Sequence, residues 1–317
     1  MIKRLLFVSL LCNVVIGIAF LMQQFLPAGT GGQSLPVNRE IQKFRYLSPR
    51  ILQEYKNDTL INFLPLRRSI HERVRPFGET FAVYFEYLPT GTSIGVNEKK
   101  EYLAASLIKV PVVMAHFREK EHDEAGMVDD EHVMLTLKEG DIDPLYGELW
   151  KKGVGARVSM DDAVSLALRK SDNTAVMAIA HNTKQEHFDA VYEGVDIDWK
   201  MDQENTVIAA KSFSSILKAL YFSAVLSKES SQAILEHMTK TDFFDKLPAG
   251  VPKGVPVAHK IGSYNNESFS DCGIVYQVKR PYILCMISQS SEDEARSRMK
   301  RVSKEVYNFV SNANSLK

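Results

Sequence analysis

Ser106 and Lys109 form a Ser-x-x-Lys pattern, a pair of residue types at a spacing that could do chemistry. They lie at the start of an apolar run, Leu107 to Phe117, which predicts a helix buried in the middle of a domain. Side chains three residues apart on a helix share one face and lie within hydrogen-bond reach. A serine hydroxyl attacks a carbonyl when a base takes its proton, and a lysine can be that base if burial or a neighbouring cation lowers its pKa. The pair therefore predicts a serine nucleophile with a lysine base.

A Ser-x-x-Lys pattern has little weight by itself, because it also occurs at Ser215 and Ser297, on amphipathic patterns that predict solvated helix faces. Two further motifs suit the same chemistry. Ser171-Asp172-Asn173 stands between predicted helices and is also an ordinary helix start, with Ser or Asp as the N-cap. Lys260-Ile261-Gly262 ends a predicted strand and is also explained as a strand-end lysine followed by a turn glycine.

In their order along the chain, the three motifs resemble the Ser-x-x-Lys, Ser-Asp-Asn and Lys-Thr-Gly signature of class A β-lactamases and penicillin-binding proteins. The flanking sequence is similar to this superfamily in residues 104–111, 158–175 and 271–275. The resemblance covers about residues 60–315, and the chain is identified as a member of the superfamily.

The resemblance implies a role for each matching residue. Ser106 would form the acyl-enzyme, Lys109 would accept its proton, and Ser171 would relay a proton to the leaving nitrogen. Lys260 would keep the electrostatic potential near Ser171 positive. Asn173 would contact Lys109 and the substrate amide.

The resemblance also implies a substrate-binding strand end that contains Gly262 and Ser263. The backbone N–H groups of Ser106 and Ser263 would form the oxyanion hole, in which each donor typically contributes roughly 3–4 kcal/mol.

The sequence departs from the family pattern in three places. The family's β-lactamases carry a glutamate on a loop after Ser-Asp-Asn, and here that loop is mostly missing; Glu204 is the nearest carboxylate and is expected to be solvated. Ile261 replaces the hydroxyl residue of Lys-Thr-Gly, and Cys272 stands where many class A enzymes place an arginine for the substrate carboxylate. Losing a general base costs roughly 10²–10⁴ in rate, so acylation can persist where fast hydrolysis does not.

Three functions follow from the motifs and their departures. The first is a serine hydrolase of the class A β-lactamase type, which forms an acyl-enzyme at Ser106 on a β-lactam or related amide. The alternatives are a D,D-peptidase or transpeptidase acting on cell-wall peptides, and a degenerate wall-binding module. With 39 basic and 39 acidic residues, the composition gives no reason to expect nucleic acid as a partner. No cofactor and no metal are expected, since the acidic, histidine-containing stretch 116–132 fits no tight ligand spacing.

The hydrophobic patterns predict an α+β fold. Strands are expected near 80–96 and again at 255–261, 273–277 and 282–288, with helices at 161–169, 173–182, 213–226 and at the chain's end. Strands from both chain ends should form one antiparallel sheet of about five strands, flanked by helices and by an inserted all-helical subdomain.

The N-terminus predicts a membrane anchor. Lys3 and Arg4 precede Leu5 to Met22, a run without charge that is long enough for one transmembrane helix. The expected organisation is an anchor or signal segment at 1–26, a linker at 27–60, and the hydrolase domain at 61–317 on the extracytoplasmic side.

Cys272 and Cys285 fall on two neighbouring strands joined by a turn near 278–281. A tight hairpin centred on that turn would place Cys272 opposite Met286 and turn Cys285 to the other face of the sheet. The sequence therefore predicts two buried free thiols rather than a disulfide.

Overall fold

A five-stranded antiparallel sheet forms the centre of the fold in the computed structural model, which describes residues 61–122, 133–197 and 206–313. Its strand order is β2-β1-β9-β8-β7. The strands are β1 (Phe81–Tyr87), β2 (Thr92–Val96), β7 (Val257–Tyr264), β8 (Ser268–Val275) and β9 (Tyr282–Gln289). Because β1 pairs with β9, the sheet joins segments from the two ends of the domain, which confirms the predicted α+β fold.

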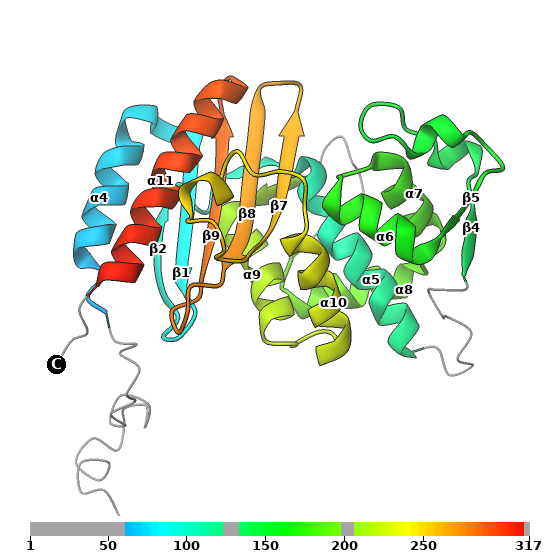
Figure 1. Cartoon of the computed structure of the whole chain (residues 1–317), viewed down its shortest axis with the longest axis horizontal. Coiled ribbons are helices and arrows are strands. Elements are labelled where there is room, and N and C mark those ends of the chain that lie inside the picture. The colour runs from blue at the N-terminus through cyan, green and yellow to red at the C-terminus, as the bar shows by residue number, and fades with distance from the viewer. Residues whose placement is uncertain (1–60, 123–132, 198–205, 314–317) are drawn as a thin grey trace, which may run out of the picture. The chain divides into compact units, whose positions relative to one another are not determined.

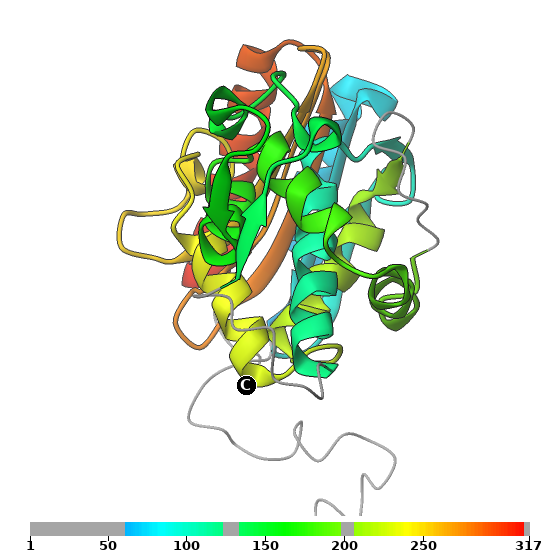
Figure 2. The same cartoon turned by 90° about the vertical axis from the view of Figure 1, so that its right-hand side faces the viewer.

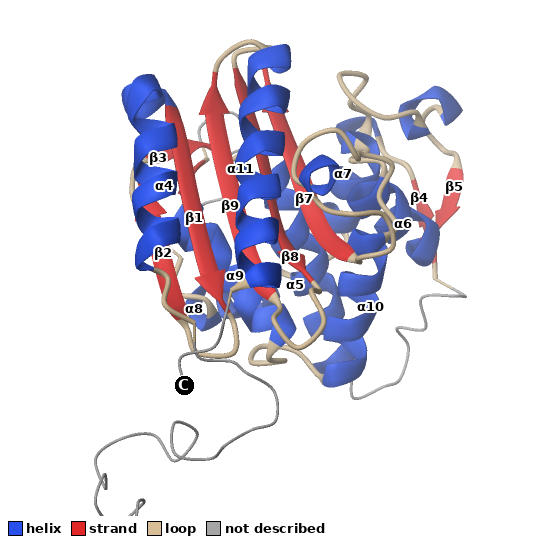
Figure 3. Cartoon of the chain, turned by 60° about the vertical axis from the view of Figure 1, so that its left-hand side comes forward, coloured by secondary structure: helices blue, strands red, loops and turns tan. Residues whose placement is uncertain are grey.

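Two helices cover one face of the sheet (Figures 1 and 3): α4 (Leu64–Val74) and α11 (Glu292–Asn312). On α4 the buried side chains are Leu66, Ile70 and Val74, a stripe with helical spacing. The long helix α11 starts with a capping box formed by Ser291 and Glu294. These two helices cover one face of the sheet, and the helices described next cover the other face.

Helices from the middle of the chain cover the other face and extend beyond the sheet (Figure 1). They are α5 (Lys109–His122), α6 (Met160–Arg169), α7 (Asn173–His181), α8 (Gln185–Gly194), α9 (Ala210–Tyr221) and α10 (Lys228–Thr239). Helix α9 packs on strands β1, β8 and β9, while α5 contacts α6, α7, α8 and α10. In Figure 2 the molecule is turned by 90°, so that this helical subdomain faces the viewer. Two short ladders complete the fold: β3 (Glu101–Leu103) with β6 (Val207–Ala209), and β4 (Met134–Thr136) with β5 (Arg157–Ser159).

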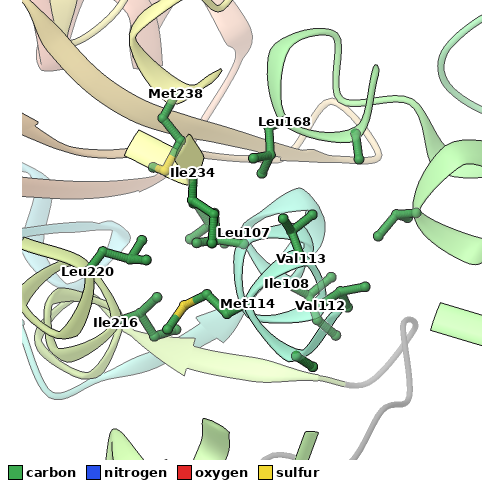
Figure 4. Close-up of a cluster of buried hydrophobic side chains, with 14 of the residues drawn as sticks. Leu107, Ile108, Val112, Val113, Met114, Leu168, Ile216, Leu220, Ile234 and Met238 are labelled. Atoms are coloured by element: carbon green, nitrogen blue, oxygen red, sulfur yellow. The ribbon is translucent and has the colours of Figure 1, made fainter. Parts of the chain in front are cut away.

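The start of α5 is enclosed by neighbouring helices. A 3₁₀ turn, Ala105–Ile108, leads into it, and Leu107 and Met114 are fully buried. Figure 4 shows these side chains packed with Ile216 of α9 and Ile234 of α10. Such close packing fixes the backbone on which Ser106 and Lys109 stand.

The prediction of free thiols is wrong, because Cys272 and Cys285 form a disulfide between β8 and β9. The two cysteines are direct partners in the ladder, which starts at the pair Val275 and Tyr282. The prediction placed Cys272 opposite Met286, and a shift of one residue turns every side chain of a strand to the other face. Both cysteines are fully buried in the core beneath the helices.

The predicted anchor at 1–26 and the linker at 27–60 lie outside the described residues. Within the ranges that are described, no helix combines the length and the apolar character needed to cross a bilayer. The anchor therefore stays a prediction from the sequence.

Candidate active site

A cavity of about 490 Å³ lies where the start of α5, the loop before α7 and the end of β7 meet. Five of the seven predicted site residues line it: Ser106, Lys109, Ser171, Asn173 and Ser263. Lys260 and Gly262 are not in the lining of this cavity, but both contact residues beside it: the Nζ of Lys260 donates to the Oγ of Ser171, and Gly262 lies against Ala105. Segments far apart in the sequence thus meet at one place.

Ser106 is held in the 3₁₀ turn that leads into α5. The preceding residue, Ala105, has a φ of 46°, in the left-handed region that non-glycine residues rarely adopt. No hydrogen bond from the described residues engages the Ser106 hydroxyl, which is half-buried and faces the cavity. The turn therefore presents the hydroxyl to a ligand.

Strand β7 approaches this turn closely at Gly262. A Cβ at that position would lie 2.5 Å from the Oγ of Ser270 and 3.2 Å from the carbonyl oxygen of Ala104. The first distance is shorter than real Cβ atoms show and the second is tight, so a side chain at Gly262 would crowd both strand β8 and the turn that carries Ser106. The glycine lets Ser263, the next residue, lie in the same cavity as Ser106.

Lys109 lies in the wall of the cavity with its amine turned toward the loop before α7. The side chain is 3% exposed. Its Nζ donates to the carbonyl oxygen of Ser171, to the Oδ1 of Asn173 at 2.5 Å and to the Oγ of Ser171 at 3.3 Å. The lysine thus connects the turn that carries Ser106 with the Ser-Asp-Asn motif.

The Ser171-Asp172-Asn173 motif is both a helix start and part of the site. Asp172 is the N-cap of α7, since its Oδ1 accepts from the N–H of Ala175 at 2.9 Å. Its Oδ2 accepts from two backbone N–H groups of the loop at 148–149. Ser171 has a φ of 57°, which is uncommon for a residue with a side chain. The helix-cap explanation of the motif holds for Asp172, while Ser171 and Asn173 face the cavity.

Lys260 reaches the site from the opposite side. It is 1% exposed on β7, and its Nζ donates to the Oγ of Ser171 at 2.8 Å and to the carbonyl oxygen of Ile261 at 3.1 Å. Since Lys109 also donates to this Oγ, the Ser171 oxygen accepts from two amines. A hydroxyl has one hydrogen of its own to donate, and here that hydrogen is left for an acceptor in the cavity.

Burial shifts the pKa of both lysines downward. It lowers the pKa of Lys109 to about 7, although the carboxylates of Asp172 and Asp143 act in the opposite direction. Burial also lowers the pKa of Lys260, and the nearby amine of Lys109 lowers it further against the effect of Asp271. Two ammonium groups that share one hydroxyl repel each other, so a neutral amine is favoured at one of them near neutral pH.

Asp143 is a site residue that the sequence analysis missed. It lines the cavity, and its Oδ2 accepts from the Nδ2 of Asn173 at 3.0 Å. A carboxylate can only accept, so this bond turns the amide of Asn173 with Oδ1 toward Lys109. No motif marks Asp143, because it lies in an irregular loop; the adjacent Pro144 signals a turn and not a site.

The departures from the family pattern have visible consequences. Ile261 lines the cavity with an apolar side chain next to Ser263. Cys272 is the ladder partner of Lys260, but it is bound in the disulfide and is not a donor for a ligand. Glu204 lies outside the described residues. Among the lining residues that the structure describes, Asp143 is the one carboxylate.

The fold defines a class of proteins, since solved β-lactamases and penicillin-binding proteins share it. A point mutant of PBP-A, solved as an acyl-enzyme complex with penicillin G, matches with a TM-score of 0.69 and 23% identity over 77% of this chain and 95% of its own. TLA-3 extended-spectrum β-lactamase matches with a TM-score of 0.68 and 20% identity over 78% and 99%. Among curated proteins, Beta-lactamase 3 of Bacillus cereus is 22% identical over 237 residues, which cover 70% of this chain and 73% of that protein.

The family follows from the sequence itself. The profile of the beta-lactamase enzyme family matches residues 65–310, most of the chain. The protein belongs to the beta-lactamase enzyme family.

Proposed function

We propose that this protein is a serine hydrolase of the class A β-lactamase type, which forms an acyl-enzyme at Ser106 on a β-lactam or a related amide. One observation carries the proposal: the hydroxyl of Ser171 accepts hydrogen bonds from Lys109 and Lys260, in the wall of the cavity that Ser106 faces. This arrangement supports the assignment of Ser106 as nucleophile, Lys109 as base and Ser171 as proton donor, because the three residues line one cavity.

In the proposed acylation, Lys109 is neutral and so has given up one of its three N–H donors. Its free electron pair takes the hydroxyl proton while the Oγ of Ser106 bonds to the carbonyl carbon. The carbon–nitrogen bond then breaks, and Ser171 gives its proton to the departing nitrogen. Lys109 replaces that proton across the 3.3 Å contact, so the proton lost by Ser106 ends on the leaving nitrogen. The backbone N–H groups of Ser106 and Ser263 would stabilise the oxyanion. Water then hydrolyses the ester and restores Ser106.

A second candidate is a D,D-peptidase or transpeptidase acting on cell-wall peptides, which shares the acylation step. The observation that favours it concerns Asp143, the one carboxylate among the lining residues that the structure describes. This carboxylate already accepts a hydrogen bond from Asn173. If Asp143 is held by its bonds and does not activate water, hydrolysis of the acyl-enzyme would be slower by roughly 10²–10⁴. A lasting adduct supports this candidate, whereas rapid turnover supports a β-lactamase.

The disulfide supports an extracytoplasmic location. Disulfides persist in oxidising compartments and are rare in the cytosol. The Cys272–Cys285 bond thus favours the same side of the membrane as the predicted N-terminal anchor. The location stays part of the proposal.

The test is incubation with a fluorescent penicillin, followed by intact-mass measurement. We expect one adduct on the wild type and none on Ser106→Ala. Ser297→Ala is a matched control, because Ser297 begins another Ser-x-x-Lys pattern on the exposed face of α11 and should keep the adduct. A folded Ser106→Ala protein that is labelled like the wild type contradicts the proposal. If Ser106→Ala also leaves the protein's cellular effect intact, the wall-binding module gains support.

A further inference from the structure

Two charged residues, Asp143 and Lys109, line the cavity. Asp143 contributes a carboxylate, and the lining residues that the structure describes include no arginine. Lys109 directs its amine at Ser171 and Asn173, which accept its hydrogen bonds. The Lys260 amine is bonded to Ser171 and Ile261 behind the lining. The carboxylate of Asp143 is therefore the charge that the 143–146 loop offers to a ligand in the cavity.

Asp143 is fixed by its neighbours in a definite orientation. Its Oδ1 accepts from the N–H of Leu145 at 2.8 Å, and its Oδ2 accepts from Asn173 at 3.0 Å. Its own N–H donates to the Oγ1 of Thr174 at 3.0 Å. An ionised carboxylate has about four acceptor positions, so each oxygen keeps one for a ligand. The carboxylate is half-buried, and such a preorganised acceptor suits an ammonium group.

The side chains beside Asp143 are apolar and face the solvent. Leu145 is 85% exposed and Tyr146 is 41% exposed, and both line the cavity. A ligand that covers this exposed surface would exclude water from its contact with Asp143 and strengthen the attraction. The face of the Tyr146 ring also attracts cations.

We propose that Asp143 selects acyl donors that carry an ammonium group on the part of the substrate that lies against the 143–146 loop. This inference rests on the proposed function, because it concerns substrates that acylate Ser106. Amides with an ammonium group at that position are the preferred substrates. Neutral amides are weaker substrates, and amides with a carboxylate there are disfavoured.

Three penicillins with the same nucleus test this preference. Ampicillin, benzylpenicillin and carbenicillin carry an ammonium, a hydrogen and a carboxylate on the same side-chain carbon. Their second-order rate constants for acylation are measured by competition with the fluorescent penicillin. We expect ampicillin to react about fivefold faster than benzylpenicillin and carbenicillin about fivefold slower, as for one partly exposed ion pair. Equal rates for the three compounds overturn the inference.

Asp143→Asn should remove the ranking. The substitution also affects Asn173 and Lys109, so all three rates can fall together, and the ratios between compounds are the readout. Asp242→Asn is the matched control, since it removes an exposed carboxylate from the neighbouring hollow and should keep the ratios. A folded Asp143→Asn protein that keeps the wild-type ratios also overturns the inference.

Binding to Ser106→Ala separates this inference from the proposed function. The variant keeps Asp143 but cannot be acylated at Ser106, so equilibrium binding of the three penicillins can be measured by calorimetry. We expect the same ranking in affinity. If the wild type forms no adduct but the ranking in binding holds, acylation at Ser106 fails and the charge preference stands. Equal affinities, or binding of none of the compounds, overturn the preference.

Discussion

The amine of Lys260 donates to the Oγ of Ser171 at 2.8 Å, across 89 residues of sequence. This bond joins strand β7 to the loop before α7. It fixes the position of the hydroxyl that we propose as proton donor.

Ser171→Ala should therefore slow acylation by roughly 10²-fold, because it removes a positioned proton donor. It leaves the carbonyl of Ser171, and so the bond from Lys109, in place. Stopped-flow measurement with a chromogenic β-lactam gives the acylation rate, and thermal unfolding checks the fold. Ser230→Ala, at the start of α10, is a control that should keep the wild-type rate. A folded Ser171→Ala protein that acylates at the wild-type rate would remove Ser171 from the mechanism.

The acylation rate should depend on pH through Lys109. In the proposed mechanism the neutral amine of Lys109 is the base, and burial lowers its pKa to about 7. The rate should thus rise with pH through about 7 and fall about tenfold for each pH unit below, as the amine takes up a proton. The pH profile of single-turnover acylation checks this. A rate that is constant from pH 5 to pH 9 contradicts a lysine base.

Asp143→Asn should move that profile to lower pH. The carboxylate of Asp143 raises the pKa of Lys109 against the effect of burial, so its removal lets the pKa fall further. The same single-turnover assay measures the midpoint. A midpoint that stays in place or moves upward contradicts this account of the charges around Lys109.

Ile261→Thr should raise acylation by carboxylate-bearing β-lactams severalfold. The side chain lines the cavity beside Ser263, and a hydroxyl there can donate to a carboxylate. Ile261→Val is the matched control, because valine has the shape of threonine without its hydroxyl. The ratio of the two acylation rates isolates the hydroxyl. If the threonine variant reacts no faster than the valine variant, the substrate carboxylate does not lie near residue 261.

Much of the fold follows from local patterns in the sequence. The strand signals near 80–96 and 255–288 correspond to β1, β2 and β7–β9, and the helix predicted at 161–169 corresponds to α6. Helices α8 and α10 were not predicted. Helix α10 (Lys228–Thr239) buries two serines beside three large apolar residues, so its periodicity is weak and tertiary packing decides its structure.

The candidate site was predicted where motifs mark it and missed where contacts define it. Ser106, Lys109 and Ser171 were found by residue type and spacing. Asp143 was missed because its importance comes from a bond to Asn173 across 30 residues. The disulfide was missed for a similar reason, since the length of the β8–β9 turn sets a register that the sequence leaves open by one residue.

Removing the disulfide should destabilise the domain. The bond closes a loop between two cysteines 13 residues apart, and loops of this size typically contribute about 2–4 kcal/mol. The double variant Cys272→Ala, Cys285→Ala should unfold at a lower urea concentration than the wild type. A reductant should lower the midpoint of the wild type and leave that of the double variant unchanged. Equal midpoints for the oxidised wild type and the double variant contradict a stabilising bond.

The most direct test of the central claim is to map the covalent adduct. Trypsin cleaves after Lys100 and Lys109, so Ser106 lies in the peptide 101–109, with Ser106 as its one serine. After reaction of the wild-type protein with benzylpenicillin, tandem mass spectrometry should find the penicilloyl group on Ser106 in this peptide. An adduct on any other residue, with peptide 101–109 recovered unmodified, would contradict the assignment of Ser106 as the nucleophile.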